Sequence, residues 1–358
     1  MKKLNYYLPE LKFEILVSNN DYDIVKKKID ESIILYKDNS NKVITIKYIA
    51  NEDIFEKLLK EIKPLEGKIY NSFKNQTHKE VILDGKKYYL VNSEEYICQM
   101  ENKESYIIYV KQNTENSANW IVRIIRELYL REKENTGYYF MHGTALMINN
   151  KGVMLLGTSG SGKTTLAVKL LDTDINTKFL SNDRVFVNEK LDMEYFPQAV
   201  TYAMGTVKNN TKLDKYFRNN RILENKKNIN YENATNEMDC NTSLTDVEKI
   251  FENTEMISKA KLNYIIYPRL YVDYDETEML EMDENEKKKL LDITNFTPYD
   301  TESLRKPWIM KRNLSDKELI KNKRKFEQTL IKNVKIIKLK YGAKTNAKKI
   351  IKELEDIR

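Results

Sequence analysis

Residues 157–164 carry the pattern in this sequence that is most specific for chemistry. They read Gly-Thr-Ser-Gly-Ser-Gly-Lys-Thr and match G-x-x-x-x-G-K-[ST] at every defined position. In such a loop the glycines let the backbone turn tightly around phosphate groups, and successive N–H groups point at one anion. We therefore predict that Lys163 contacts the β- and γ-phosphates of ATP and that the Thr164 hydroxyl ligates Mg²⁺. The residues predicted to bind the nucleotide are Gly157, Thr158, Ser159, Gly160, Ser161, Gly162, Lys163, Thr164 and Thr165.

The flanking residues predict the strand and the helix that a phosphate loop requires. Residues 153–156 form a short apolar run, which is typical of a buried strand. After the loop, apolar side chains recur with helical spacing at Leu166, Ala167, Leu170 and Leu171. The alternative is a glycine-rich turn that binds nothing. The full match between a strand and a helix argues against that alternative.

Two polar side chains follow the next predicted strand. That strand covers residues 178–181 and ends before Asn182 and Asp183, and a return strand follows at residues 185–187. A carboxylate at the end of a strand beside the phosphate-loop strand is where a nucleotide site needs a metal ligand or a base. The ordinary alternative is a type I turn that carries Asn-Asp. Spacing alone does not distinguish a functional site from an ordinary turn here.

The chain has two histidines, and the sequence places them differently. His142 lies on a predicted strand, fifteen residues before Gly157, where it is either a satisfied core residue or part of the site. His78 stands beside Lys79 without a chemical partner, so we predict that it lies on the surface.

Length and composition exclude several classes of protein. The 358 residues, 41% of them hydrophobic, suffice for one large or two medium globular domains. Cys98 and Cys240 lie far apart without metal-ligand spacing, which argues against a zinc site and for a reducing compartment. No uncharged apolar run could span a bilayer, and Pro9 and Glu10 interrupt the N-terminus before an apolar segment forms. We therefore expect a cytoplasmic protein that does not enter membranes.

The net charge of +7 is unevenly distributed along the chain. Residues 301–358 contain 18 Lys and Arg against 7 Asp and Glu. Such a region can attract an acidic peptide, a protein or a nucleic acid. The lysines lie between helix-spaced apolar residues and no nucleic-acid motif accompanies them, which favours a solvated face and makes a nucleic-acid partner unexpected. A homo-oligomer is compatible with the sequence.

The pattern of elements predicts an α/β protein with two domains. Residues 1–112 predict a small α+β domain with a helix over residues 53–62 and a hairpin at Asp84-Gly85. Its predicted strands are residues 13–17, 32–36, 43–48, 80–83, 87–91 and 106–110. The domain has no catalytic set of residues, so we expect it to serve substrate recognition or assembly.

The second predicted domain comprises residues 113–358 and contains the phosphate loop. A helix over residues 117–134, capped by Ser117, would open it. Residues 208–255 are polar and predict a mobile insertion that acts as a lid or substrate loop. Arg269, after a predicted strand, is either a surface arginine or a source of positive charge for a transition state.

His142-Gly143, the loop at residues 157–164 and the strand end at Asn182-Asp183-Arg184-Val185 together resemble the catalytic domain of bacterial HPr kinase/phosphorylase. They are most similar to stand-alone HPr-kinase-like proteins, some of which are associated with peptide natural-product pathways. The resemblance covers roughly residues 115–210. It implies a P-loop nucleotide domain of the HPr kinase/phosphoenolpyruvate carboxykinase type, preceded by the small α+β domain. The chain has neither the signature sequence of ABC-transporter ATPases nor an apolar run ending in Asp-Glu.

The resemblance also implies roles for single residues. His142 would lie near the γ-phosphate, Lys163 on the β/γ-phosphates and Thr164 on Mg²⁺. Asp183 matches the second carboxylate of the family's Asp-Asp pair, which supplies a base toward the acceptor hydroxyl and a group near the metal. Asn182 replaces the first carboxylate and can ligate a metal through its carbonyl, although it cannot take a proton. Asp183, His142 and Lys163 are thus the expected catalytic residues, and Thr164, Asp183 and Asn182 the expected metal ligands.

We therefore expect an ATP- and Mg²⁺-dependent kinase that phosphorylates a Ser/Thr-type hydroxyl on a peptide or protein, with peptide natural-product maturation as one setting. The Glu-Ile-Arg-Gly element of true HPr kinases is absent after Pro197, so the acceptor is expected to differ from HPr. The alternative is a nucleotide-binding regulatory or scaffold module that transfers no phosphoryl group. Asp183 favours the enzyme, and Asn182 favours the alternative.

Overall fold

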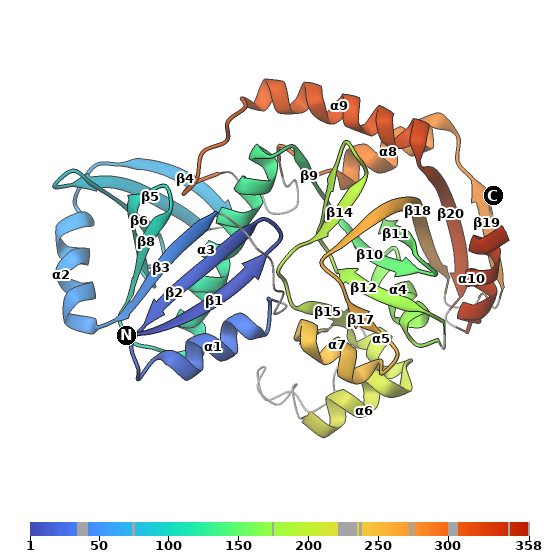
Figure 1. The fold of residues 1–358 in the computed structure, drawn as a ribbon, viewed down its shortest axis with the longest axis horizontal. Coiled ribbons are helices and arrows are strands. Elements are labelled where there is room, and N and C mark those ends of the chain that lie inside the picture. Colours follow the sequence, from blue (N-terminus) through green and yellow to red (C-terminus); the bar gives the residue numbers. More distant parts are fainter. Residues whose placement is uncertain are drawn as a thin grey trace. The chain divides into compact units, whose positions relative to one another are not determined.

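The computed structural model describes residues 1–33, 42–73, 76–173, 175–220, 235, 238–271, 274, 276–299, 307–342 and 344–356. The chain is a mixed α/β protein with two large mixed sheets (Figure 1). It divides into two compact units. Unit 1 comprises Met1–Gly137 and Thr297–Leu319, and unit 2 comprises Tyr138–Phe296 and Ile320–Arg358.

In the described part of unit 1, eight strands form one sheet in the order β1-β2-β3-β8-β7-β6-β5-β4. Strands β2, β3 and β8 run parallel to one another, and the other neighbouring pairs are antiparallel. Asp84 and Gly85 join β5 to β6 with φ of 49° and 73°, the backbone that a type I′ hairpin needs. The strands are β1 (Lys2–Leu8), β2 (Leu11–Val17), β3 (Val43–Ala50), β4 (Lys68–Phe73), β5 (Gln76–Leu83), β6 (Lys86–Val91), β7 (Ile97–Asn102) and β8 (Ser105–Val110).

Five of the six strands predicted for this part of the chain lie within observed strands. They are residues 13–17, 43–48, 80–83, 87–91 and 106–110. The sixth, residues 32–36, falls mostly outside the described residues. Strands β1, β4 and β7 were not expected from the sequence.

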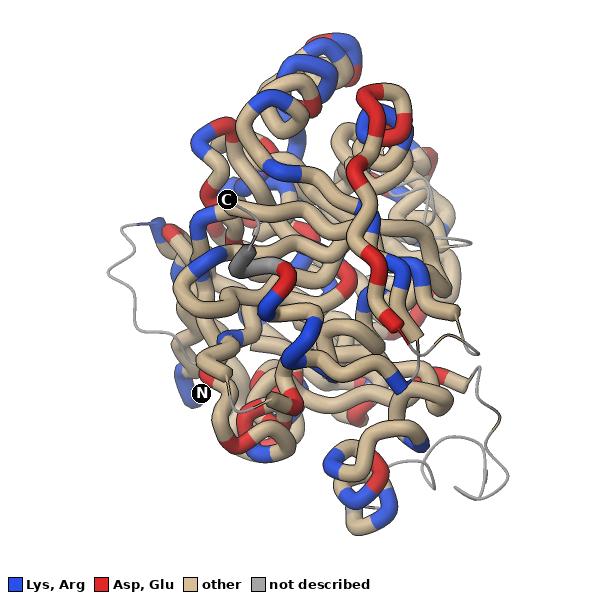
Figure 2. Tube along the Cα trace, turned by 90° about the vertical axis from the view of Figure 1, so that its right-hand side faces the viewer, with Lys and Arg blue, Asp and Glu red and all other residues tan. Residues whose placement is uncertain are grey.

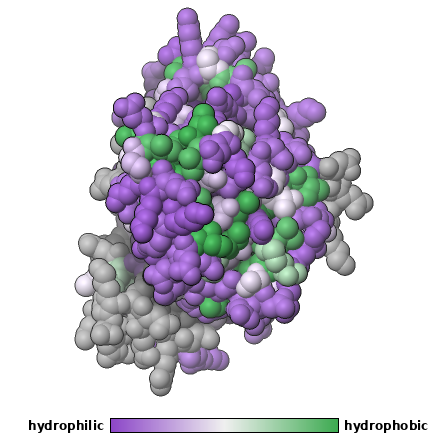
Figure 3. All heavy atoms as spheres, turned by 90° about the vertical axis from the view of Figure 1, so that its left-hand side faces the viewer, coloured by the Kyte–Doolittle hydropathy of each residue, from purple (hydrophilic) through white to green (hydrophobic). Residues whose placement is uncertain are grey.

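Helix α2 (Glu52–Ile62) covers one face of this sheet and confirms the helix predicted there. Its buried Phe55, Leu59 and Ile62 pack against side chains of β5, β6 and β7. The Asn51 side chain accepts a hydrogen bond from the Ile54 N–H and thereby caps the helix. Figure 3 views this side of the molecule, where hydrophobic side chains form only small patches among hydrophilic ones.

Helix α3 (Glu115–Asn135) belongs to unit 1, as does α1 (Tyr22–Asp30). The predicted boundary near residue 112 placed α3 in the second domain, and the structure differs because the helix packs against the sheet of unit 1. The Trp120 ring lies 4.3 Å from that of Tyr96, centroid to centroid, and Tyr48 Oη lies 3.1 Å from Ser117 Oγ. The cap is Thr114, three residues before the predicted Ser117, which completes a capping box with it.

Residues 297–319 belong to unit 1, although the sequence placed them in the second domain. One residue of this segment, Trp308, also explains why the prediction for His78 is wrong. Trp308 stacks on the His78 ring with centroids 3.8 Å apart, and the His78 Nε2 atom is hydrogen-bonded to the Tyr96 hydroxyl. The His78 side chain is buried, not exposed as predicted. The stacking residue lies more than two hundred positions along the chain, so no local pattern could reveal it.

A network of charged side chains is buried where α3 ends. The Arg131 guanidinium donates to Glu127 at 2.8 Å and to Glu134 at 2.6 Å. Arg312, from the returning segment, donates to the two carboxylate oxygens of Glu134 at 2.8 and 2.9 Å. The side chains of Arg131, Glu127 and Glu134 are at most 2% exposed, so these charges depend on one another for compensation.

In the described part of unit 2, ten strands form the second sheet, with eight of them in the order β17-β12-β10-β11-β18-β14-β13-β9. Strand β20 pairs with β18 and with β19. These strands are β9 (Tyr138–Met141), β10 (Gly143–Ile148), β11 (Lys151–Leu156), β12 (Thr177–Ser181), β13 (Val185–Asn188), β14 (Asp192–Tyr195), β17 (Glu255–Met256), β18 (Lys259–Tyr271), β19 (Thr277–Glu281) and β20 (Lys335–Gly342). A smaller sheet pairs β15 (Val200–Ala203) with β16 (Asp239–Thr242).

Several helices accompany the sheet of unit 2. They are α4 (Lys163–Leu171), α5 (Met204–Lys208), α6 (Thr211–Asn220), α7 (Leu244–Ile250), α8 (Glu284–Thr294) and α10 (Ala347–Asp356), and α9 (Asp316–Asn333) begins in unit 1 and ends in unit 2. Where the segment predicted as a mobile insertion, residues 208–255, is described, it is largely folded into α6, β16 and α7. Apolar side chains in both helices are buried, which stabilises them. Residues 221–234 and 236–237 lie outside the described residues.

Part of the basic excess in residues 301–358 is compensated within unit 2. Lys338 pairs with Glu286 at 2.8 Å, Lys340 with Glu278 at 2.9 Å and Lys323 with Asp292 at 3.0 Å. Basic and acidic residues accordingly alternate over this side of the molecule in Figure 2. In the described part of the chain, no helix is long and apolar enough to cross a membrane.

Candidate functional site

The sheet of unit 2 brings three separate segments to one edge. Strand β10 runs antiparallel to both β11 and β12, with Gly143 opposite Leu156 and Ala145 opposite Ser181. The start of β10 therefore lies beside the ends of the other two strands. His142 precedes β10, the loop at residues 157–162 follows β11, and Asn182 and Asp183 follow β12. The predicted β12 strand is confirmed, although β10 separates it from β11 instead of the two being neighbours.

The loop after β11 leads directly into α4, as the sequence predicts. Lys163, the first helical residue, is buried and donates to the carbonyls of Gly157 at 2.8 Å and Thr158 at 3.0 Å. Gly162 has φ of 98°, a left-handed conformation that favours glycine. A Cβ atom there would lie 2.5 Å from the Tyr341 hydroxyl oxygen, so the site has no room for a side chain.

Unused donors in the loop fit an anion. Among the described residues, no backbone hydrogen bond is formed by the N–H groups of Ser159, Gly160 and Gly162. The buried Ser161 Oγ also has no hydrogen-bond partner there. A Cβ on Gly160 would meet no atom within 4 Å, so the loop is open at that point. These donors, together with the N-terminus of α4, match the oxygens of a phosphate group.

Asn182 is held between two threonine hydroxyls. Its Oδ1 atom accepts from Thr144 at 2.9 Å and from Thr164 at 3.3 Å. The Thr164 hydroxyl and the Asn182 carbonyl thus form an oxygen pair next to the loop, which is the kind of ligand that Mg²⁺ accepts. The described residues contain no cluster of three or more His, Cys, Asp and Glu that could hold a metal by itself. A cation here would also need oxygens from the phosphates.

Asp183 has a strained backbone. Its φ is 66°, and the Arg184 N–H donates to the Asn182 carbonyl at 2.8 Å, which closes a three-residue γ-turn. The γ-turn with positive φ is the rare, strained form, and such conformations cost of order 1–3 kcal/mol. The predicted alternative of a type I turn is wrong, because its central residues have negative φ. Strain of this kind is most frequent at functional sites.

Three side chains hold the Asp183 carboxylate. His142 Nε2 lies 3.2 Å from Oδ1, Arg184 Nη1 lies 2.9 Å from Oδ2, and Gln198 donates to Oδ2 at 3.3 Å. Burial acts to raise the pKa of Asp183, but the hydrogen bond from His142 and the charges of Arg184, His142 and Lys163 outweigh it and hold the pKa well below its usual range. The Asp183 side chain is still 34% exposed. It is therefore an ionised carboxylate that an incoming group can reach.

Sequence reasoning missed several residues of this site. Arg184 had no assigned role, although it directly follows the Asn182-Asp183 pair. Gln198, Thr144 and Tyr341 gave no sequence signal, because each reaches the site through tertiary contacts. Arg269, the candidate for transition-state charge, is exposed and donates to the Tyr267 hydroxyl at 2.8 Å.

Tyr341 supports the loop from β20, and removing its hydroxyl tests that support. The buried hydroxyl donates to the Gly162 carbonyl at 2.7 Å, and burial raises the pKa of this tyrosine. Tyr341→Phe should lower the free energy of unfolding by about 0.5–1.5 kcal/mol, the usual contribution of one hydrogen bond. Urea unfolding measures the change, with Tyr271→Phe on the exposed end of β18 as control. Equal stability of the two variants would show that the hydroxyl does not hold the loop.

The loop, the Thr164–Asn182 oxygen pair and the Asp183 carboxylate thus form one constellation at one sheet edge. It offers anion-binding amides, two neutral oxygen ligands for a cation, and an ionised, accessible carboxylate. No protein-family model matches this chain, and no curated protein matches it.

Proposed function

We propose that unit 2 is an ATP- and Mg²⁺-dependent kinase of the HPr-kinase-like type that phosphorylates a Ser/Thr-type hydroxyl on a peptide or protein. One observation carries the proposal: the complete phosphate-loop sequence, between β11 and α4, lies at the same sheet edge as the ionised Asp183. A phosphate site and an acceptor-orienting carboxylate are the two parts that phosphoryl transfer needs.

The loop would hold the triphosphate of ATP. The free amides of Ser159, Gly160 and Gly162 would donate to phosphate oxygens, and the Lys163 ammonium would exchange its present carbonyl acceptors for the β- and γ-phosphates. Thr164 and Asn182 would hold Mg²⁺ through their side-chain oxygens. The ion would supply positive charge to the phosphate oxygens.

Asp183 would orient the acceptor hydroxyl. Its low pKa makes it a weak proton acceptor before the reaction, because general bases work best with a pKa near the working pH. Phosphoryl transfer depends mainly on positioning and charge stabilisation, so a carboxylate that accepts a hydrogen bond from the hydroxyl is sufficient. His142 and Arg184 fix the orientation of this carboxylate. In this proposal Asp183 orients the acceptor, and the neutral oxygens of Thr164 and Asn182 hold the metal.

Lys163→Ala tests the nucleotide site. The change removes a cationic contact to the phosphates, so the affinity for ATP–Mg²⁺ should fall by about 2 kcal/mol or more, roughly 30-fold. Isothermal titration calorimetry measures the dissociation constant. Lys178→Ala is the matched control, because Lys178 lies on β12 opposite Met147 of β10, away from the strand end that precedes Asn182, and pairs with Glu255. If both variants bind ATP like the wild type, the loop is not a nucleotide site.

A further inference from the structure

Unit 1 contains a pocket on the face of its sheet that α2 does not cover. Successive residues of a strand point to opposite faces. Val81, Tyr88 and Leu90 pack toward α2, whereas Glu80 and Tyr89, their neighbours in the sequence, line the pocket. The pocket has a volume of about 740 Å³, within the range of roughly 300–1,000 Å³ that ligand sites occupy.

The returning part of unit 1, residues 307–313, forms the other wall. Trp308 anchors it, because its ring stacks on His78 and meets Tyr89 edge-on with centroids 5.5 Å apart. The Asn135 side chain donates to the Lys311 carbonyl at 3.1 Å and thus ties the segment to the end of α3. Residues 307–313 therefore pack on this face of the sheet as an irregular segment, and the pocket lies next to them.

The charges around the pocket do not balance. Six basic and three acidic side chains line it: Lys42, Lys68, Lys87, Lys103, Lys311 and Arg312, against Glu80, Glu104 and Glu132. Lys42 pairs with Glu132 at 2.6 Å, and Lys87 pairs with Glu80 at 3.3 Å. Arg312 pairs with Glu134 in the buried network of charged side chains at the end of α3.

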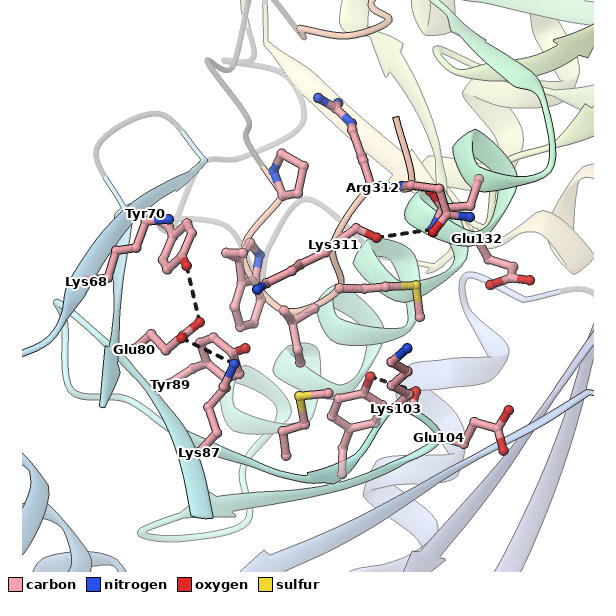
Figure 4. A pocket seen from close by; sticks show the side chains of 18 of the residues that line it. Lys68, Tyr70, Glu80, Lys87, Tyr89, Lys103, Glu104, Glu132, Lys311 and Arg312 are labelled. Atoms are coloured by element: carbon pink, nitrogen blue, oxygen red, sulfur yellow. Dashed lines mark hydrogen bonds and ion pairs between the residues drawn. The ribbon is translucent and has the colours of Figure 1, made fainter. Parts of the chain in front are cut away.

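Three lysines remain without a carboxylate among the described residues. They are Lys68 on β4, Lys103 in the β7–β8 turn and Lys311 on the returning segment. All three side chains are exposed, and Lys68 lies over the Tyr70 ring at 4.7 Å. Figure 4 shows Lys311 reaching across the pocket toward the side that carries Tyr70 and Glu80. The three ammonium groups come from different elements, so one small anion is a poor match for all of them.

Apolar side chains line the pocket between these charges. Trp308, Ile309, Met100 and Met310 contribute, together with the rings of Tyr89 and Tyr106. Thioether and aromatic groups adapt to apolar side chains of different shape. The pocket thus combines separated positive charges with an apolar floor. A chain that carries acidic side chains on either side of a large apolar one matches both features.

We propose that this pocket binds an acidic peptide segment with a large apolar side chain, which enters beside residues 307–313. Carboxylates of the peptide pair with Lys68, Lys103 and Lys311, and its apolar side chain packs on Trp308 and the methionines. Only the identification of this peptide as the phosphate acceptor rests on the proposed function. Binding of the peptide itself requires neither ATP nor phosphoryl transfer.

Fluorescence anisotropy tests the proposal with the full-length protein, without nucleotide and at physiological salt. The probe is the fluorescein-labelled octapeptide Glu-Asp-Leu-Glu-Phe-Asp-Ser-Glu, compared with a version in which Gln and Asn replace the acidic residues. The pocket variant Lys68→Glu/Lys311→Glu should bind the acidic peptide about tenfold or more weakly than the wild type. Lys57→Glu/Lys60→Glu changes the net charge equally on exposed positions of α2 and should bind it like the wild type, because salt screens charges beyond about 8 Å.

Several outcomes would overturn the proposal. Equal loss in both double variants would show that net charge alone attracts the peptide, and equal binding of the neutral peptide would exclude pairing with the lysines. Displacement by millimolar inorganic phosphate as efficient as by unlabelled peptide would point to a small anion. If the double variant unfolds, the single exposed substitution Lys103→Glu tests the pairing of the peptide with the pocket lysines independently. Since calorimetry with ATP is separate, loss of the peptide site and loss of the nucleotide site are distinguishable.

Discussion

Replacing Asp183 with asparagine should reduce phosphoryl transfer about 100-fold or more while ATP binding changes little, the size of effect expected when the group that orients a reactant is lost. Asparagine keeps the shape of the side chain but removes the negative charge that His142 and Arg184 hold in place. Asn182 cannot take over, because its amide carries no negative charge and its carbonyl is engaged by Thr144 and Thr164. Transfer is measured with γ-labelled ATP on a library of Ser- and Thr-containing acidic peptides.

The control for this prediction is Asp192→Asn. Asp192 is a β14 carboxylate that pairs with Lys261 on β18 and lies in a different part of the sheet. Its variant should transfer phosphate like the wild type. If the wild-type protein binds ATP but phosphorylates no peptide, and Asp183→Asn leaves the ATP-dependent binding of a partner intact, a nucleotide-controlled scaffold replaces the kinase.

Ionisation of Asp183 should make the rate of phosphoryl transfer only weakly dependent on pH under mildly acidic conditions. An ordinary aspartate has a pKa of about 3.9. The pKa of Asp183 lies well below that, so its carboxylate stays ionised as the pH falls from 7 to about 5. The same reasoning applies to stability. A depressed folded-state pKa stabilises the fold above the unfolded value, and this contribution disappears only as the pH falls through the folded value.

Replacing Arg131 with methionine should lower the free energy of unfolding of unit 1 by about 3–5 kcal/mol, the typical result of removing one partner of a buried ion pair. The Arg131 side chain is 2% exposed and pairs with the buried Glu127 and Glu134. Without the guanidinium, Glu127 and Glu134 share a low-dielectric site in which Arg312 still pairs with Glu134.

Tryptophan fluorescence during urea unfolding isolates this effect. The two tryptophans of the chain, Trp120 and Trp308, both lie in unit 1, so the signal reports that unit. The matched comparison is the double variant Glu127→Gln/Arg131→Met, which removes one charge of each sign. It should be more stable than Arg131→Met alone, since fewer buried charges are uncompensated. A single variant within about 1 kcal/mol of the wild type would mean that water reaches these carboxylates.

Features encoded by neighbouring residues could be predicted from the sequence. The strand, loop and helix around residues 157–164 follow from glycine spacing and apolar periodicity, both of which act within one turn of chain. The same holds for α2, for most of α3 and for the Asp84-Gly85 hairpin. In each case the local hydrogen bonds and the buried face agree, so the tertiary structure does not override the pattern.

The sequence by itself determined the phosphate loop and the Asn182-Asp183 pair, whereas only the tertiary structure decided what surrounds them. Tyr341 meets Gly162 across 179 positions, and Trp308 covers His78 after the chain has passed through unit 2. The meeting of His142 with Asp183 depends on β10 lying antiparallel to both of its neighbours. Strand order and register result from side-chain packing across the whole sheet. The hydrophobic pattern of the sequence predicts which face of the sheet a residue lies on, but it does not predict which strand lies beside it.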